Sequence, residues 1–226
     1  MGEYYKWVNV DRREFLSPPE FGYGSKRWET MWREKNELLR ALRELLSGEW
    51  SGCRVAFLGD EKTVGPDSGN ETLQTLYRHT VAFGFPGDAA DLVAETYRNV
   101  DGLFRAAQEE VRWEIGIWLE ELADGNPHRF RNEYGIDPAD PYRGLFERGG
   151  RDFRYTLNHT KKLCFAFPET TVLDRKRQVL EYTDPLPDLM AYGRAGKTGA
   201  WLGDLIGVAD AMPQGYTLLR EIMIDC

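Results

Sequence analysis

The sequence predicts an α+β fold in which two related β-rich modules are joined by a long or broken helical connector. The first observation is an ungapped match between residues 4–16 and 153–165, in which an asparagine aligns with an asparagine and a basic pair with a basic pair. The second is a Trp-x-Gly segment after each match, beginning at Trp50 and at Trp201. The interval from asparagine to tryptophan is nearly equal in both halves. Two ordered matches at similar spacing indicate an internal duplication.

Each matched segment has the pattern of a β-hairpin. In the second copy Phe153, Tyr155 and Leu157 alternate with polar residues before a polar turn and a further β-rich run. The matched asparagines, Asn9 and Asn158, fall on the side opposite this apolar face. Asparagine at a hairpin entry bonds to nearby backbone groups. We therefore predict turn residues at both positions, facing away from the core, with a ligand-binding role as the alternative.

Between the first hairpin and Trp50, apolar residues recur at intervals of three and four. This spacing predicts one amphipathic helix over residues 28–46, ended by Gly48, with its stripe in the core. The stripe comprises Trp28, Met31, Trp32, Lys35, Leu38, Leu39, Leu42, Leu45 and Leu46. The second copy lacks this helix. Its residues 171–173 and 178–182 flank a polar turn and predict another hairpin instead.

The longest helical pattern starts at Asp88, the expected N-cap, and ends before Gly125. A continuous helix of about 36 residues would be roughly 50 Å long, which exceeds a small domain. We therefore predict two helices or one bent helix joining the halves, followed by an irregular linker rich in Pro and Gly. The resulting division is a first module at 1–84, a connector and linker at 85–150, and a second module at 151–226, all in one compact body.

Composition excludes several classes of protein. The chain has 226 residues and 42% hydrophobic content, enough for a core. It contains no leader and no apolar run of about 18 residues, so we expect a cytoplasmic protein without a membrane span. Three cysteines without CxxC spacing indicate reduced structural thiols, and we expect neither a metal nor another cofactor. The net charge of -8 argues against general nucleic-acid binding and can steer the protein toward a basic partner.

One local segment, residues 191–198, fits the loose form of a phosphate-binding loop with alanine in place of the first glycine. Its Arg194 and Lys197 would form a compact basic spot for a phosphate or carboxylate. However, prolines precede the segment and a strand-like run follows it, whereas a true loop of this kind connects a buried strand to a helix. The alternative is a structural, glycine-rich loop that enters a strand.

Further candidate ligand-binding residues are Asp204 and Asp210, acids beside the second Trp-x-Gly segment, and Trp201, which could stack a ring if exposed. Acids at strand ends are more often solvated turn residues, which is the alternative. The three histidines fall in different predicted elements without a catalytic spacing. The sequence therefore assigns no catalytic residue and favours a protein without enzymatic activity.

Two functional hypotheses follow from these features. The first is a soluble, cytoplasmic, non-enzymatic protein-interaction module; one class that fits is an immunity-type protein that neutralises a basic toxin through complementary charge. The alternative is a protein or enzyme that binds a small molecule or phosphate-bearing ligand, with its site where the two modules meet. The oligomeric state is not predicted.

Overall fold

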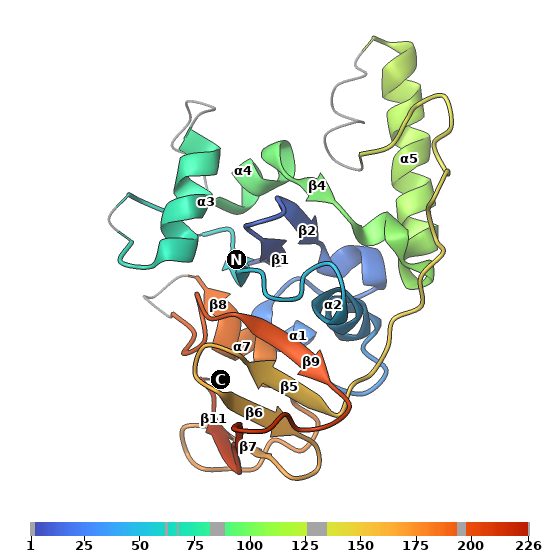
Figure 1. Cartoon of the computed structure of the whole chain (residues 1–226). Helices are drawn as coiled ribbons and strands as arrows, with labels where there is room; N and C mark the ends of the chain where they lie inside the picture. The colour runs from blue at the N-terminus through green and yellow to red at the C-terminus, as the bar shows by residue number, and fades with distance from the viewer. Residues whose placement is uncertain are drawn as a thin grey trace.

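The computed structural model describes residues 3–61, 63–66, 68–81, 89–125, 135–193 and 198–225 (Figure 1). Over these residues helices combine with a five-stranded, a four-stranded and a two-stranded sheet. The α+β class predicted from the sequence is confirmed.

The five-stranded sheet is built around the first predicted hairpin. In spatial order its strands are β4 (Arg98–Asn99), β2 (Glu14–Leu16), β1 (Tyr5–Asn9), β3 (Val55–Gly59) and β8 (Ala191–Tyr192). The strand β1 pairs antiparallel with both β2 and β3, whereas β4 and β8 add in parallel at the two edges. Because β8 comes from the C-terminal part of the chain, this sheet ties the two ends of the sequence together.

The four-stranded sheet is built around the second predicted hairpin. Its order is β10 (Thr217–Leu218), β6 (Leu163–Ala166), β5 (Tyr155–Asn158) and β9 (Ile206–Ala209). Nearby, β7 (Thr171–Leu173) pairs in parallel with β11 (Glu221–Met223). An antiparallel bridge between Leu173 and Val179 joins the segments predicted to form a further hairpin.

Two antiparallel triplets, β2-β1-β3 and β6-β5-β9, have the same strand order and register. Asn9 lies opposite Glu14 in the first hairpin, and Asn158 lies opposite Leu163 in the second. These four residues are the ones that the sequence match aligns. In each triplet the third strand runs antiparallel beside the asparagine-bearing strand. Both predicted hairpins are thus present, at the predicted positions.

The matched asparagines hold the turns in the same way. Asn9 Oδ1 accepts the backbone N–H of Arg12, and Asn158 Oδ1 accepts that of Lys161, each at 2.9 Å. Both asparagines are turn residues, but both are fully buried. The predicted outward orientation is wrong, because elements pack on both faces of these strands.

Other details also recur in the two triplets. Arg13 and Lys162, the residues after the bonded N–H groups, have left-handed φ angles of 54° and 55°. Trp50 and Trp201 both lie buried before the third strand. A left-handed turn residue and a buried tryptophan thus occur at matching positions in both triplets.

The helix predicted over residues 28–46 is divided. Its parts are α1 (Arg27–Thr30) and α2 (Glu37–Ser47). Asn36 causes the break, because its Oδ1 caps α2 at the N–H of Leu39 (2.9 Å) while its Nδ2 donates to carbonyls of the preceding turn. Trp28 and Trp32 are 68% and 50% exposed, so the prediction that they belong to the core stripe is wrong.

The long helical pattern is also divided. It contains α4 (Ala89–Thr96) and α5 (Gln108–Ala123), with β4 and the 3-10 turns η2 (Asp101–Leu103) and η3 (Arg105–Ala107) between them. Buried Asp101 explains the break, since its Oδ1 accepts the N–H of Ser17 at 2.9 Å and ties this segment to the chain after β2. The predicted N-cap Asp88 lies outside the described residues.

The helix α2 joins the two triplets through a shared core (Figure 1). It lies between the sheets and packs on β9. One hydrophobic cluster includes Trp7 and Phe57 of the first triplet, Phe165 and Ile206 of the second, and the leucines of α2. The remaining helices are η1 (Pro18–Phe21), α3 (Glu71–Val81) and α7 (Leu186–Met190).

Candidate functional site

Of the residues that the sequence grouped as a ligand site, the structure describes Trp201, Asp204 and Asp210. Arg194 and Lys197 lie outside the described residues. Trp201 is buried, with its ring centroid 5.7 Å from that of Phe165, so it packs in the core and offers no surface for stacking a ligand.

The two candidate acids belong to different ion pairs. Asp204 is buried, and its Oδ2 accepts from Asn158 Nδ2 and from Lys161 Nζ, each at 2.7 Å. Asp210 is at the surface, 2.5 Å from a guanidinium nitrogen of Arg151. Asp204 therefore stabilises the β5–β6 turn, and Asp210 makes a surface ion pair.

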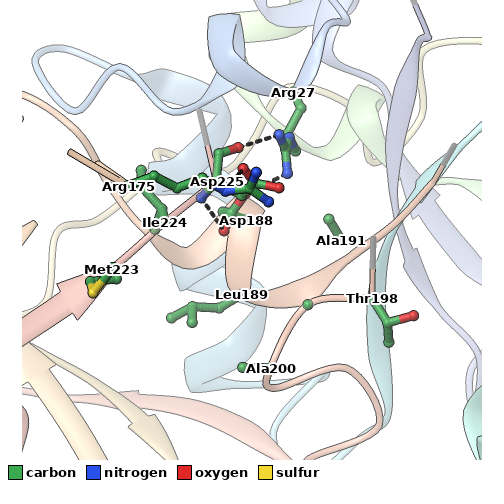
Figure 2. Close-up of a pocket in the computed structure, with 11 residues that line it drawn as sticks. Arg27, Arg175, Asp188, Leu189, Ala191, Thr198, Ala200, Met223, Ile224 and Asp225 are labelled. Atoms are coloured by element: carbon green, nitrogen blue, oxygen red, sulfur yellow. Dashed lines mark hydrogen bonds and ion pairs between the residues drawn. The ribbon is translucent and has the colours of Figure 1, made fainter. Parts of the chain in front are cut away.

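A pocket of about 520 Å³ lies beside the predicted phosphate-binding loop (Figure 2). It is bounded by α7 and by the end of β11. Both described flanks of the loop contribute to it, through Ala191 on one side and Thr198, Gly199 and Ala200 on the other. A Cβ at Gly199 would lie 2.2 Å from the carbonyl oxygen of Leu189, so only glycine allows this close approach to α7.

The charged side chains of this pocket pair with one another. Figure 2 shows Arg27 pointing toward Asp188, to which its Nη1 donates at 2.5 Å, and toward the Asp225 carbonyl, to which its Nη2 donates at 2.5 Å. Arg175 Nε lies 2.5 Å from Asp225 Oδ1. Two guanidinium groups thus balance two carboxylates. The described walls carry no excess positive charge with which to hold a phosphate.

A second candidate is the outer surface of α5, which carries most of the net charge of the protein. Residues 108–124 contain six acidic residues and one basic residue, a formal charge of -5 against -8 for the whole chain. The acidic residues are Glu109, Glu110, Glu114, Glu120, Glu121 and Asp124. Figure 1 shows α5 at the periphery of the molecule, extending away from the sheets.

Two large apolar side chains lie within this acidic surface. Trp113 is 62% exposed and Ile117 is 37% exposed, one helical turn apart. Glu109 precedes Trp113 by four residues and Glu121 follows Ile117 by four, so acidic side chains bracket the apolar pair along one ridge. We call Trp113, Ile117 and the six acidic residues the α5 surface.

The helix does not need this surface for its own packing. Its inner face is anchored by Val111, Ile115 and Trp118, all buried in the core. Acidic groups in a first helical turn favour the helix dipole, but acidic groups at its C-terminal end, as at Glu120 and Asp124, oppose it. The charge of the last turn therefore reduces helix stability, which favours a role in recognition.

Neither a metal centre nor a membrane span is found in the part of the chain that the structure describes. Over those residues no group of three or more His, Cys, Asp or Glu side chains is arranged to hold a metal ion. No helix there is both long and apolar enough to cross a membrane.

Comparison of the chain with protein-family models, with curated proteins and with solved structures found no match.

The sequence prediction missed the α5 surface although a signal for it was present. Val111, Ile115 and Trp118 recur at helical spacing in the sequence and form the buried face of α5. Trp113 and Ile117 fall off that stripe, among acidic residues. Two features of the sequence indicate this helix. Its predicted segment has a large negative net charge, and it contains a tryptophan that lies outside the apolar stripe.

Proposed function

We propose that this protein is a non-enzymatic interaction module that binds a basic protein partner through the α5 surface. The observation that carries the proposal is the concentration of charge: one exposed helix bears a net -5, and a largely exposed tryptophan lies in its middle.

Two physical effects support this proposal: electrostatic steering of the partner and burial of an apolar anchor. Charge of one sign on a projecting helix attracts a partner of opposite sign and raises its association rate. Tryptophan is enriched among the few interface residues that supply most of the binding energy, since its ring buries a large area in a partner pocket. The acidic rim around Trp113 and Ile117 matches the usual arrangement of an apolar centre and a polar periphery.

An immunity-type role, in which the partner is a basic toxin, is the specific form of this proposal that best fits the charge. It places both proteins in the cytoplasm of the cell that makes the inhibitor. The alternative, a small phosphate-bearing ligand at residues 191–199, has weaker support, because Arg27 and Arg175 are already paired with Asp188 and Asp225.

We further propose that the two triplets descend from an internal duplication. Support comes from the shared register, the equivalent asparagine-capped turns and the paired tryptophans. In this view α5 belongs to the segment that joins the copies, so the partner-binding surface arose outside the repeated unit.

A site-specific photo-crosslinking experiment tests the partner proposal. A photoreactive amino acid placed at position 113 in the cells that naturally make the protein should capture a basic protein. The same substitution at Trp28, which is 68% exposed but lies on α1, serves as the control and should not capture that protein.

Once the captured partner is purified, variants can measure the contributions of the tryptophan anchor and of the acidic residues separately. The Trp113→Ala variant should weaken binding by about 2 kcal/mol or more, mainly through faster dissociation. Replacing Glu109 and Glu110 with glutamine should slow association and reduce its salt dependence. The proposal is wrong if position 113 captures no specific protein, or if the partner binds both variants as well as it binds the wild type.

A further inference from the structure

A second cavity, of about 270 Å³, lies where the two triplets meet and is separate from both candidate sites above. The first half of the chain contributes Arg33, Glu34 and Arg43. The second half contributes Asp152, Phe153, Arg154, Thr156, Phe165 and Phe167. The volume is below the usual range for drug-sized ligands, so it suits a molecule with a single ring.

The inner wall of this cavity contains a buried cation. Arg43 extends from α2 at a position that continues the leucine stripe, four residues after Leu39 and three before Leu46, and it is more than nine-tenths buried. Its Nη2 bonds to Asp184, which is fully buried, and its Nη1 lies 3.8 Å from Asp152. The Nε atom of Arg43 has no hydrogen-bond partner. The Arg43 side chain lines the cavity as a buried positive charge beside Asp184 and Asp152.

The outer wall contains a second cation. The guanidinium of Arg33 lies 4.1 Å from the ring centroid of Phe167, and its Nη2 donates to the carbonyl of Glu181 at 3.1 Å. Among the residues that the structure describes, Arg33 has no carboxylate within ion-pair distance, unlike Arg154, which pairs with Glu169. Arg33 is therefore the pocket arginine best able to accept an anionic ligand.

Aromatic side chains complete the cavity. Phe165 and Phe167 meet edge to face with centroids 5.8 Å apart, and Phe153 lies beside them. Such rings favour contact with another ring, by stacked or edge-on packing. The lining thus offers an apolar, ring-shaped surface beside guanidinium groups.

We propose that this cavity binds a small aromatic carboxylate, with the ring against the phenylalanines and the carboxylate between Arg33 and Arg43. Guanidinium groups bind carboxylates with paired, charge-assisted hydrogen bonds, which accounts for the choice of a planar anion. Glu34 and Asp152, which also line the cavity, disfavour ligands with more than one negative charge. The site is independent of the α5 surface and joins the two halves of the molecule through its ligand.

The test uses phenylacetate as the probe and backbone NMR of the full chain as the readout. We expect a dissociation constant of about 1 mM or tighter for a ligand of this size. The amide signals of Thr156, Phe165 and Phe167 should shift. Neutral phenylacetamide should bind about tenfold more weakly, since it lacks the charge, and acetate should bind more weakly than phenylacetate, since it lacks the ring.

Two variants test whether phenylacetate binds in this cavity and not elsewhere on the protein. The Arg33→Gln variant should lose about tenfold in affinity for phenylacetate, because its donors to the carboxylate become neutral. The matched control, Arg175→Gln, removes an arginine from the other pocket and should bind as the wild type does. Arg33 is preferred to Arg43 for this test, because removing Arg43 would leave buried Asp184 without its cation.

Three results would overturn the proposal. These are no signal change at phenylacetate concentrations of about 10 mM, equal binding of phenylacetate and phenylacetamide, and shifts that map to Arg27 and Asp188 or to α5 instead. Equal affinity of the Arg33→Gln variant and the wild type would likewise contradict it.

Discussion

The triplets β2-β1-β3 and β6-β5-β9 share a backbone but differ in the acid that holds each turn. In the first, Glu14 on β2 is the acceptor, and it receives Trp50 Nε1 at 2.8 Å, Arg12 Nε at 3.0 Å and a guanidinium nitrogen of Arg98. In the second, the position aligned with Glu14 is Leu163, which carries no charge. The same chain path is therefore compatible with two different arrangements of buried polar groups.

The second triplet places its acid on the segment before the third strand. Asp204 receives Asn158 Nδ2 and Lys161 Nζ. Its counterpart in the first triplet, three residues after the buried tryptophan, is Cys53. Without an acid there, the Nδ2 atom of Asn9 is buried and has no hydrogen-bond partner.

This difference shows which features a β-hairpin requires and which it can exchange. The asparagine Oδ1 bond and the left-handed basic residue occur in both turns, because they set the backbone direction. The buried acid lies on β2 in the first triplet and on the segment before β9 in the second. Its role is to satisfy donors near the turn, and more than one position can do this.

The largest expected effect comes from removing the acid of the first triplet. We expect Glu14→Ala to lower the free energy of unfolding by about 2–4 kcal/mol, because three donors lose a charged acceptor and Trp50 Nε1 stays buried without one. The matched change Leu163→Ala should cost only about 1–2 kcal/mol, since that side chain is partly buried and uncharged. Urea denaturation measures both. Equal losses would show that Glu14 acts only by filling space.

The dependence of stability on pH provides a second test of the role of Glu14. Burial by itself would raise the pKa of Glu14, but hydrogen bonds from Arg12 and Trp50 and the charge of Arg98 together lower that pKa below its ordinary value of 4.5. The unfolded chain therefore binds the proton first as the pH falls. The stabilisation from Glu14 is complete above pH 4.5 and is lost as the pH falls through the folded-state pKa.

The measurement is the free energy of unfolding of the wild type and of Glu14→Gln, from pH 7 downward. The difference between the two proteins should shrink below pH 4.5. A difference that stays constant across this range would contradict the role of the ionised carboxylate.

The second triplet should respond to the loss of Asp204. We expect Asp204→Ala to cost about 1.5–3 kcal/mol, since Asn158 Nδ2 would then be buried without an acceptor, as Asn9 Nδ2 already is. Lys161→Ala should cost less than about 1 kcal/mol, because the lysine side chain is 44% exposed and an ion pair near the surface contributes little. If the lysine variant lost as much as the aspartate variant, the ion pair rather than the buried amide would dominate.

The sequence predicted the repeated hairpins because their signal is local. A short stretch of sequence is enough to recognise each of three signals: alternating apolar and polar residues, an asparagine at the turn, and a tryptophan at a fixed interval. Each signal corresponds to an observed feature. The breaks in the two predicted helices were less visible. At Asn36 and Asp101 they depend on side-chain bonds to backbone groups outside the helical pattern, which periodicity does not record.

The candidate sites were harder to predict, because they depend on exposure and on contacts between distant segments. Trp113 and Trp201 look alike in sequence, yet one is exposed and the other lies in the core. The pairing of Arg27 with Asp188 joins residues far apart in the chain. Arg43 was not singled out from the sequence, although a charged residue at a position in the leucine stripe of α2 is visible from spacing alone.

The smallest expected effect comes from placing an acid in the first triplet at the position that Asp204 occupies in the second. This substitution is also the most direct test of whether Cys53 and Asp204 occupy equivalent positions. In Cys53→Asp the new carboxylate should accept from Asn9 Nδ2, which now has no partner, and should raise the free energy of unfolding by about 0.5–1.5 kcal/mol. The gain should vanish in an Asn9→Ala background, because the donor is then absent, and a double-mutant cycle isolates this interaction. Cys53→Ser controls for loss of the thiol. If Cys53→Asp gains nothing over Cys53→Ser, or gains as much without Asn9, the positions of Cys53 and Asp204 are not equivalent and the two triplets hold their turns by unrelated means.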